Sequence, residues 1–333
     1  MRIAMRRHLL ATTAAEAQIE HRPVPGMSSD ARPPRELRNV YGGDSFRCVY
    51  LIAACAATFA MAMMGATGPA AAQNNACVPG TPGNNASVTC MGVVNNQNDP
   101  DGFFADANNL RITVNPVSVT ETRNGIFLDG NNDIIRILTG ASVTGGTTGS
   151  GILADSNNNT ISIETGASVT GGVGITANNN NTIINAGTIT GTGGTAISFR
   201  NENTLTLAPT SVINGVVSGG SANTFQLDGP GNGTFDLSTI GPNQQYRGFT
   251  IFNVIGGTWT VSNTFNQTQA WNVNSGGTLA GTGTLRGVNV NDGGTLAPGT
   301  IGVPGTSMTI MGNLVFTSGA TYQVQVNPTM ASM

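Results

Sequence analysis

The pentapeptide Gly151-Ile152-Leu153-Ala154-Asp155 belongs to a repeating pattern that decides the fold. Successive copies start 26, 23 and 22 residues apart, and the others are Gly125 to Asp129, Gly174 to Asn178 and Ala196 to Arg200. Each copy is followed by an Asn-rich turn and then by a short apolar segment such as Ile161-Ser162-Ile163. A fixed period of this length is typical of solenoids, in which each repeat forms one coil.

Each repeat predicts three short strands joined by three turns. The third strand is exemplified by Gly166-Ala167-Ser168-Val169-Thr170-Gly171. One such strand offers only one or two inward apolar side chains, so a single coil cannot form a core, whereas stacked coils can. We therefore predict an all-β parallel β-helix, a solenoid of roughly nine or ten coils. A β-sandwich is the alternative, but its hairpins give no reason for a repeat of this length.

The turns of the predicted coils are rich in asparagine, as at Asn131-Asn132 and at residues 157–159. Asparagine tolerates the left-handed backbone conformation that tight turns require. Its side-chain amide can also bond to the asparagine of the next coil. We therefore predict ladders of stacked asparagines along the turns.

The chain has 333 residues, of which only 9% are charged, and 46 are glycine. Soluble domains carry roughly 25% charged residues. There is no lysine, and all 14 basic side chains are arginine. So few charges exclude disorder driven by charge repulsion. Asparagine and threonine supply the polarity that charges usually provide, and they stack from coil to coil without like-charge repulsion.

Charge is distributed unevenly. Residues 1–72 hold eight Arg and five acidic residues, a net charge of +3, whereas residues 73–333 hold six Arg and twelve acidic residues, a net charge of −6. A net negative segment without a basic stripe argues against binding to nucleic acid.

Residues 47–72 have the layout of a signal peptide. Arg47 precedes an uncharged, largely apolar run, and small residues at Ala70 and Ala72 would place the cleavage between Ala72 and Gln73. The alternative is a transmembrane anchor. It is disfavoured because the many alanines make the run only weakly hydrophobic and because small residues suited to cleavage follow it. We expect export through the Sec translocon, with residues 1–46 as a disordered leader or a misassigned start.

Removal of the signal would leave two cysteines, Cys77 and Cys90. An even pair in an exported chain predicts one disulfide bond. Residues 73–102 would then form an N-terminal cap or loop that this bond closes. A metal site at the two cysteines is the poorer interpretation, because further soft ligands are lacking.

Residues 256–327 have different repeat motifs from residues 103–255. Gly276-Gly277-Thr278-Leu279-Ala280-Gly281-Thr282-Gly283 is followed by Gly293-Gly294-Thr295-Leu296-Ala297-Pro298-Gly299 and later by Ser318-Gly319-Ala320-Thr321-Tyr322. This order, from Gly276 to Val326, closely resembles the passenger-associated repeat of bacterial autotransporters, the type V secretion family. We take Gly276, Gly277, Thr278, Leu279, Gly281, Gly283, Gly293, Gly294, Pro298 and Gly299 as its motif positions.

The resemblance implies a right-handed β-helix exported from a Gram-negative bacterium to the cell surface or beyond. It also implies an outer-membrane barrel as the export partner. We expect that barrel to be absent from this chain, because residues 328–333 form only a short tail. The chain would then be a truncated or split autotransporter, periplasmic if no barrel is supplied.

Both histidines, His8 and His21, precede the predicted signal. Residues 73–333 therefore lack histidine and lysine, so histidine-activated nucleophiles, histidine metal ligands and lysine bases are excluded there. We expect no cofactor, no metal and no catalytic residue. The alternative is a polysaccharide lyase or hydrolase whose acids lie in one column: Asp129 and Asp155, stacked with Asn178 and Arg200.

Other candidate side chains have plainer interpretations. Asp99, Asp101 and Asp106 are expected to solubilise a loop, and Trp259, Trp271 and Tyr322 to pack. We therefore expect a non-enzymatic stalk that supports adhesion to a protein or glycan surface ligand. The alternatives are the β-helix enzyme and a non-functional remnant.

Overall fold

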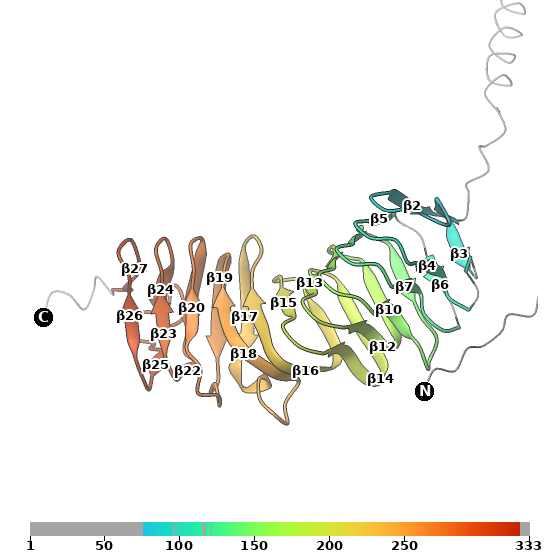
Figure 1. Cartoon of the computed structure of the whole chain (residues 1–333). Helices are drawn as coiled ribbons and strands as arrows, with labels where there is room; N and C mark the ends of the chain where they lie inside the picture. Colours follow the sequence, from blue (N-terminus) through green and yellow to red (C-terminus); the bar gives the residue numbers. More distant parts are fainter. Residues whose placement is uncertain (1–75, 96, 99, 116–117, 121, 327–333) are drawn as a thin grey trace, which may run out of the picture. The chain divides into compact units, whose positions relative to one another are not determined.

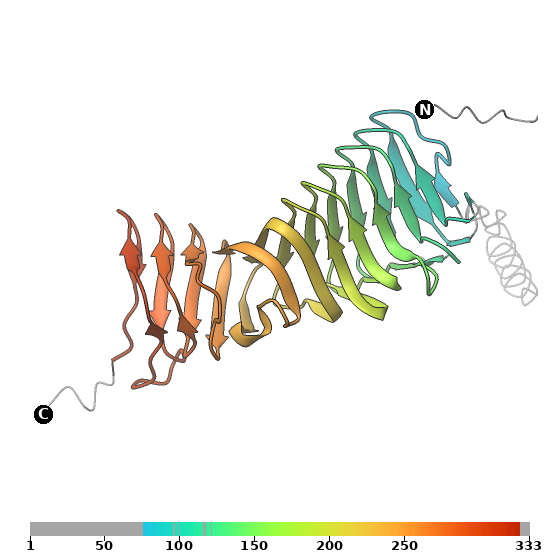
Figure 2. The ribbon, with the colours of Figure 1, turned by 60° about the horizontal axis from the view of Figure 1, so that its bottom comes forward.

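The computed structural model describes residues 76–326, apart from residues 96, 99, 116, 117 and 121. These residues form an all-β parallel solenoid of about ten turns (Figures 1 and 2), which confirms the predicted fold class. The expected leader, signal peptide and C-terminal tail, and with them Ala72 and Gln73, lie outside the described residues.

One face of the solenoid runs from the first coil to the last, and every neighbouring pair of strands in it is parallel. In order, its strands are β2 (Ser87–Met91), β5 (Arg111–Val114), β8 (Ile134–Ile137), β11 (Thr160–Ile163), β13 (Thr182–Asn185), β15 (Thr204–Leu207), the end of β16 (Val212–Leu227), the end of β18 (Tyr246–Val254), β20 (Trp271–Val273), β23 (Val288–Val290) and β26 (Leu314–Phe316).

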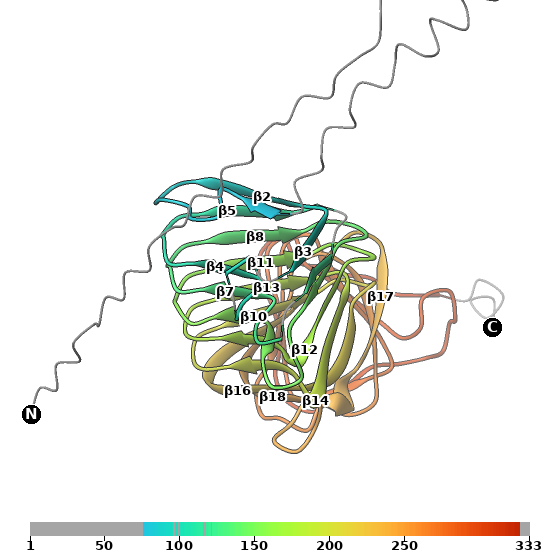
Figure 3. The same cartoon turned by 90° about the vertical axis from the view of Figure 1, so that its right-hand side faces the viewer.

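Two further faces complete the coils of the first half (Figure 3). The second face is built from β3 (Val93–Asn95), β6 (Ser118–Thr120), β9 (Ser142–Thr144) and the starts of β12 (Ser168–Ala177), β14 (Thr188–Phe199) and β16. The third face is built from β4 (Phe103–Ala105), β7 (Ile126–Leu128), β10 (Ser150–Ala154), the ends of β12 and β14, the middle of β16 and the start of β18.

The C-terminal coils use separate strands for their remaining faces. One sheet holds β17 (Asn232–Asp236), β19 (Gly257–Ser262), β21 (Gly277–Gly281), β24 (Thr295–Pro298) and β27 (Thr321–Tyr322), and a smaller one holds β22 (Thr284–Leu285) and β25 (Thr309–Ile310). A single 3-10 turn, η1 (Leu237–Thr239), follows β17. The stack of coils is continuous across residues 255 and 256, where the repeat motif of the sequence changes.

The structure differs from the prediction at one of the three turns. The third strand of a repeat and the first strand of the next were expected to be separate, but β12 and β14 each run through that corner. The pairing register of β12 with β14 shifts between Gly171 and Val173. A shift of this kind bends a strand without ending it, so glycine at the corner permits a bend where a turn was predicted.

Stacked apolar columns form the core. In the third face Ile126, Ile152, Ile175 and Ile197 occupy one register and are fully buried. In the first face the inward column runs Ile112, Ile135, Ile161, Ile183, Leu205, Phe225, Phe252, Trp271, Val288 and Leu314. The column changes from aliphatic to aromatic side chains at Phe225, which lies in the long strand β16. Beyond this strand the remaining faces of each coil are formed by other, separate strands.

Asparagine turns connect the third face to the first face, as predicted. At each such turn a residue with positive φ is flanked by an outer column, which includes Asn157 and Asn179, and by an inner column. The inner column is asparagine at Asn159, Asn181, Asn203 and Asn223, but Ala86, Leu110 and Asp133 in the first three turns. The left-handed residue is asparagine in five turns, with φ between 57° and 63°, at Asn85, Asn109, Asn132, Asn158 and Asn180.

The last two of these turns place other residues at the left-handed position, Glu202 with φ 60° and Ala222 with φ 58°. Because alanine is disfavoured in this conformation, Ala222→Gly should raise the free energy of unfolding by about 1 kcal/mol. Urea denaturation followed by circular dichroism measures this change. Ala86→Gly is the control, because φ at Ala86 is not positive, and it should lower the free energy of unfolding. If Ala222→Gly also lowered the free energy of unfolding, the prediction would be contradicted.

The first face of the solenoid is covered at its N-terminal edge. Strand β1 (Ala76–Val78) pairs antiparallel with β2, and Cys77 and Cys90 form the predicted disulfide, with an S–S distance of 2.01 Å. The Gln97 side chain accepts from the Cys77 backbone N–H and donates to the Cys77 carbonyl, both at 2.6 Å. These two bonds occupy backbone groups of β1 that would otherwise offer an edge for strand pairing.

Candidate functional site

The predicted acidic column exists as a column. Asp129, Asp155, Asn178 and Arg200 each follow the last residue of a strand in the third face. Their backbone N–H groups continue the parallel ladder, with Asp155 donating to the Leu128 carbonyl at 2.9 Å. The Asn178 amide donates to Asp155 Oδ1 at 2.9 Å. Sequence alignment of the repeats therefore placed these four residues correctly.

The surroundings of the column are open. Asp129, Asp155 and Arg200 are exposed, and one oxygen of Asp155 is already engaged by Asn178. Within the described residues, no group of three or more His, Cys, Asp or Glu side chains is close enough to hold a metal ion. Solvated carboxylates of this kind lack the burial that tunes a catalytic acid or base.

Two cavities in the described part of the chain lie away from the column. The first, about 350 Å³, lies at the C-terminal end of the solenoid. The second, about 300 Å³, lies beside the start of β18 and is lined by Tyr246, Phe249, Gln267 and Gln269 among others. Burial raises the pKa of Tyr246 to about 12, so this hydroxyl stays neutral near pH 7. Neither lining contains a carboxylate, arginine or cysteine.

The inner asparagine column is a buried, regularly bonded polar array. Asn159, Asn181, Asn203 and Asn223 are at most 1% exposed. The backbone N–H of each of the first three donates at 2.8 Å to the side-chain oxygen of the next. Each amide therefore satisfies a backbone donor that the turn would otherwise bury without a partner.

Asp133 occupies the same column but carries a carboxyl group. Its Oδ1 accepts from the Leu110 N–H at 2.8 Å, whereas its Oδ2 is buried with no hydrogen-bond partner. Burial raises the pKa of Asp133 to about 6, and the Leu110 hydrogen bond offsets part of that rise. Asp133 was not predicted as a site residue, although Asn131-Asn132-Asp133 aligns with Asn157-Asn158-Asn159 and so carried the signal.

The position of Asp133 predicts a pH-dependent stability. Because its pKa is higher in the folded chain than the ordinary 3.8, the folded state holds the proton more tightly. Ionisation therefore lowers the free energy of unfolding as the pH rises from 3.8 to 6, by about 3 kcal/mol, with no further loss above pH 6. Asp133→Asn should remove this loss, since an amide has no charge to bury.

The measurement is urea denaturation of the chain and of Asp133→Asn at pH 4 and pH 7. We expect the variant to be more stable by up to about 3 kcal/mol at pH 7, with a much smaller gain at pH 4. Asp129→Asn, at an exposed carboxylate, is the matched control and should show no such difference. An equal gain for Asp133→Asn at both pH values would contradict ionisation as the cause.

The motif glycines have structural roles. Gly276 and Gly293 have φ angles of 83° and 72° and form the turns before β21 and β24. At Gly277 and Gly294 a Cβ atom would lie 2.6 Å from the Val254 carbonyl oxygen and 2.3 Å from that of Val273. The Gly-Gly pair therefore combines a left-handed turn with a close backbone approach to the preceding coil. The remaining motif positions lie in or beside these strands: Thr278, Leu279, Gly281, Gly283, Pro298 and Gly299.

One expectation was wrong. Asp101 was expected to solubilise a loop, but it is 4% exposed and accepts from the Asn124 backbone and side-chain N–H groups. Tyr322 was expected to pack, and its ring does lie against that of Phe316, with centroids 5.9 Å apart, although it is 54% exposed because no coil covers β27 in the described residues. Trp259 and Trp271 are buried, as predicted.

The fold and its columns place this molecule in the class of parallel β-solenoids, with buried asparagines that bond the backbone of its own turns. Comparisons with protein families, with curated proteins and with solved structures find no match for the chain. Among the described residues there is no helix of the length and apolarity needed to span a bilayer.

Proposed function

We propose that this chain is an exported, non-enzymatic solenoid of the autotransporter-passenger type, which acts as a stalk and supports adhesion through its surface. The proposal rests on one observation: the buried asparagines bond to backbone groups of neighbouring coils, so these polar groups stabilise the solenoid and do not form a reactive site. The two cavities also lack the carboxylates that acid–base chemistry would need.

Two sequence features support the proposed export and the proposed autotransporter-passenger type. The first is the arginine-led apolar run with small residues before Gln73. The second is the glycine pattern from Gly276 onward, whose turns the structure explains physically. The surface ligand is a protein or a glycan, held by many weak contacts repeated along the rod.

The outward side chains of the second face offer such repetition. Ser142 and Thr144 stand in register with Ser168 and Thr170, and these with Thr188 and Thr190. Repeated weak contacts add up through high effective concentration, so no single residue dominates.

Adhesion of beads coated with the full chain to epithelial cells and to an immobilised glycan panel tests the stalk. We expect Thr170→Ala to reduce bead retention less than twofold, and combined alanine substitutions at residues 144, 170 and 190 to reduce it much further. Alanine at Thr258, an outward residue of β19, is the matched control. Complete loss from one substitution would point instead to a discrete site.

The rival function is a polysaccharide lyase or hydrolase that uses the acidic column. Polygalacturonate and alginate are suitable probes, with product release as the readout. We expect no turnover above background by the full chain. Turnover that disappears in Asp129→Asn or Asp155→Asn, with the circular dichroism spectrum unchanged, would overturn the stalk.

A further inference from the structure

The repeat of the solenoid breaks at strand β18. In the preceding coil, residues 219–222 form a turn between the third face and the first face. The residues on either side of this turn pair directly with Arg247 and Phe249, so only Gly248 lies opposite the whole turn. Gly248 has a φ of 78°, and a Cβ atom there would lie 2.2 Å from the Gly219 carbonyl oxygen. Residues 219–222 therefore project beyond the shortened coil that follows.

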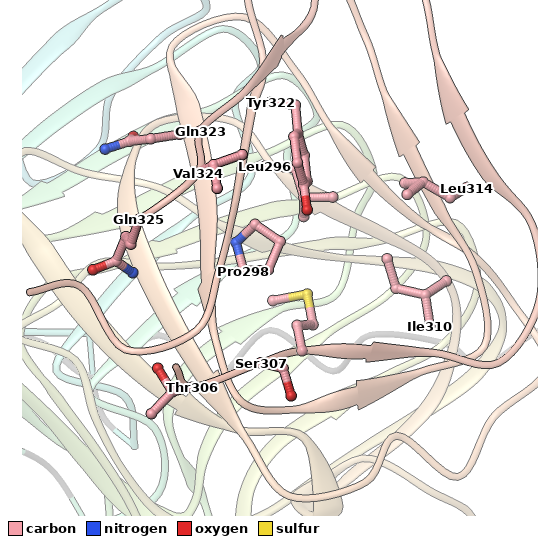
Figure 4. Close-up of a pocket in the computed structure, with 11 residues that line it drawn as sticks. Leu296, Pro298, Thr306, Ser307, Ile310, Leu314, Tyr322, Gln323, Val324 and Gln325 are labelled. Carbon is pink, nitrogen blue, oxygen red and sulfur yellow. The ribbon is translucent and has the colours of Figure 1, made fainter. Parts of the chain in front are cut away.

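The second cavity, about 300 Å³, lies at this step between coils. Its lining comes from three successive coils: Gly220 and Ser221 in the projecting turn, residues between 240 and 250 in the shortened coil, and Gln267 and Gln269 just before β20. The first cavity (Figure 4) lies instead among the last described strands. Because three coils supply its walls, the second cavity is a feature of the folded middle of the solenoid.

The lining residues of the second cavity differ in exposure. Ser221, Pro242 and Thr250 are exposed, whereas Ile240 and Phe249 are 2% and 4% exposed. The cavity therefore has a rim in contact with solvent and an apolar inner wall. Pockets for small ligands are lined in this way and have volumes of roughly 300–1,000 Å³, so this cavity has room for one small ligand.

Several polar groups of the lining lack partners within the described residues. The side-chain oxygen of Gln269 is buried and accepts no hydrogen bond there. The Gln267 amide donates only to the adjacent Asn266 carbonyl, at 3.3 Å. The Tyr246 hydroxyl forms no hydrogen bond with the described residues, and burial raises its pKa to about 12, so it stays a neutral donor near pH 7. A ligand that supplies the missing partners is favoured, because an unmade hydrogen bond of a buried group is costly.

The lining also restricts the chemistry of the ligand. None of the lining residues is charged, so a charged ligand would lose its hydration without gaining a counter-ion. Carboxamide and hydroxyl groups both donate and accept hydrogen bonds, so the ligand should carry several donors and acceptors side by side. It should also present an apolar face to Ile240 and Phe249. A neutral pyranose ring meets these requirements, with hydroxyl groups at its edge and C–H groups on its faces.

We propose that this cavity binds one neutral sugar ring, either as a free saccharide or as the end of a surface glycan. The inference deepens the proposed function, on which its role in adhesion rests, by naming the class of glycan and its site. Breaks in an otherwise regular pattern are expected at functional sites, and the cavity lies where the turn is lost opposite Gly248. The sugar contact adds to the weak contacts along the second face and does not replace them.

Saturation-transfer NMR and calorimetric titration of the full chain test this inference. The probes are the methyl glycosides of glucose, galactose, mannose and N-acetylglucosamine, with glucuronic acid and glucosamine as charged analogues. We expect at least one neutral glycoside to bind with a dissociation constant on the order of 1 mM, as is usual for so small a ligand, and the charged analogues to bind more weakly. Gln269→Ala should raise this constant by about fivefold, the effect of one lost hydrogen bond, with an unchanged circular dichroism spectrum.

The matched control is Gln244→Ala, at an exposed glutamine near the cavity but outside its lining, which should bind like the original chain. A disaccharide that ends in the preferred sugar separates the two sources: a site for glycan ends binds it at least as tightly as the methyl glycoside, and a site for free sugar binds it more weakly. No binding of any neutral glycoside would overturn the inference, as would equal effects of Gln244→Ala and Gln269→Ala. These titrations involve no cells, so their failure would leave the adhesive stalk standing.

Discussion

Replacing Phe225 by alanine is expected to lower the free energy of unfolding by about 3–5 kcal/mol, one of the largest losses that a single side chain can cause here. Phe225 is fully buried where the inward column turns aromatic. Its ring centroid lies 5.1 Å from that of Phe235, 5.2 Å from Tyr246 and 5.5 Å from Phe249. The rings come from strands fixed in the ladder, so they cannot collapse into the space.

Urea denaturation measures this loss, and Phe104→Ala is the matched control. Phe104 is only partly buried and contacts Phe127 at 5.1 Å on the outward side of its face. Its removal should cost about 1 kcal/mol, as expected for an aromatic pair near the surface. Equal losses at the two positions would show that the aromatic cluster is not the packing centre of the second half.

Asn181→Ala is expected to be almost as damaging, with a loss of about 4 kcal/mol from two buried groups left without partners. Asn181 Oδ1 accepts from the Asn159 N–H at 2.8 Å, and its amide donates to the Ser156 carbonyl at 3.0 Å. Alanine removes both bonds at a position that has no solvent-exposed surface. The change in urea denaturation midpoint measures the loss.

Asn179→Ala is the control two residues away, in the outer column. Asn179 accepts from the Asn201 N–H at 3.2 Å, and its side chain is only partly buried. Water can reach the freed donor, so we expect a loss of about 1 kcal/mol or less. If Asn181→Ala cost no more than Asn179→Ala, the buried ladder would not be a major source of stability.

Sequence repetition predicted the fold because each inward residue has the same environment in every coil. The aligned isoleucines from Ile126 to Ile197 reproduce the observed register pair by pair. The asparagine turns were predictable for the same reason, since one backbone conformation recurs at each. The column that contains Asp129 and Asp155 followed directly from the alignment.

Features that break the repeat could not be predicted. The continuous strands β12 and β14 depend on a glycine corner whose geometry is local. Asp101 is not such a feature: Asp101-Gly102 aligns with Asn124-Gly125 one period of 23 residues later, so the repeat carried a signal for its burial that the prediction did not use. The exposure of Tyr322 depends on the absence of a covering coil in the described residues, whereas its sequence pattern is that of an interior position.

The most direct test of an exported, disulfide-closed solenoid is the intact mass, measured without reduction, of protein from outside the cytoplasm of a Gram-negative host that expresses the full chain. Disulfides form in that oxidising compartment and not in the cytosol. We predict a chain that begins at Gln73 and lacks the thiol hydrogens of Cys77 and Cys90. A full-length chain that stays in the cytoplasm with both thiols free would contradict this prediction.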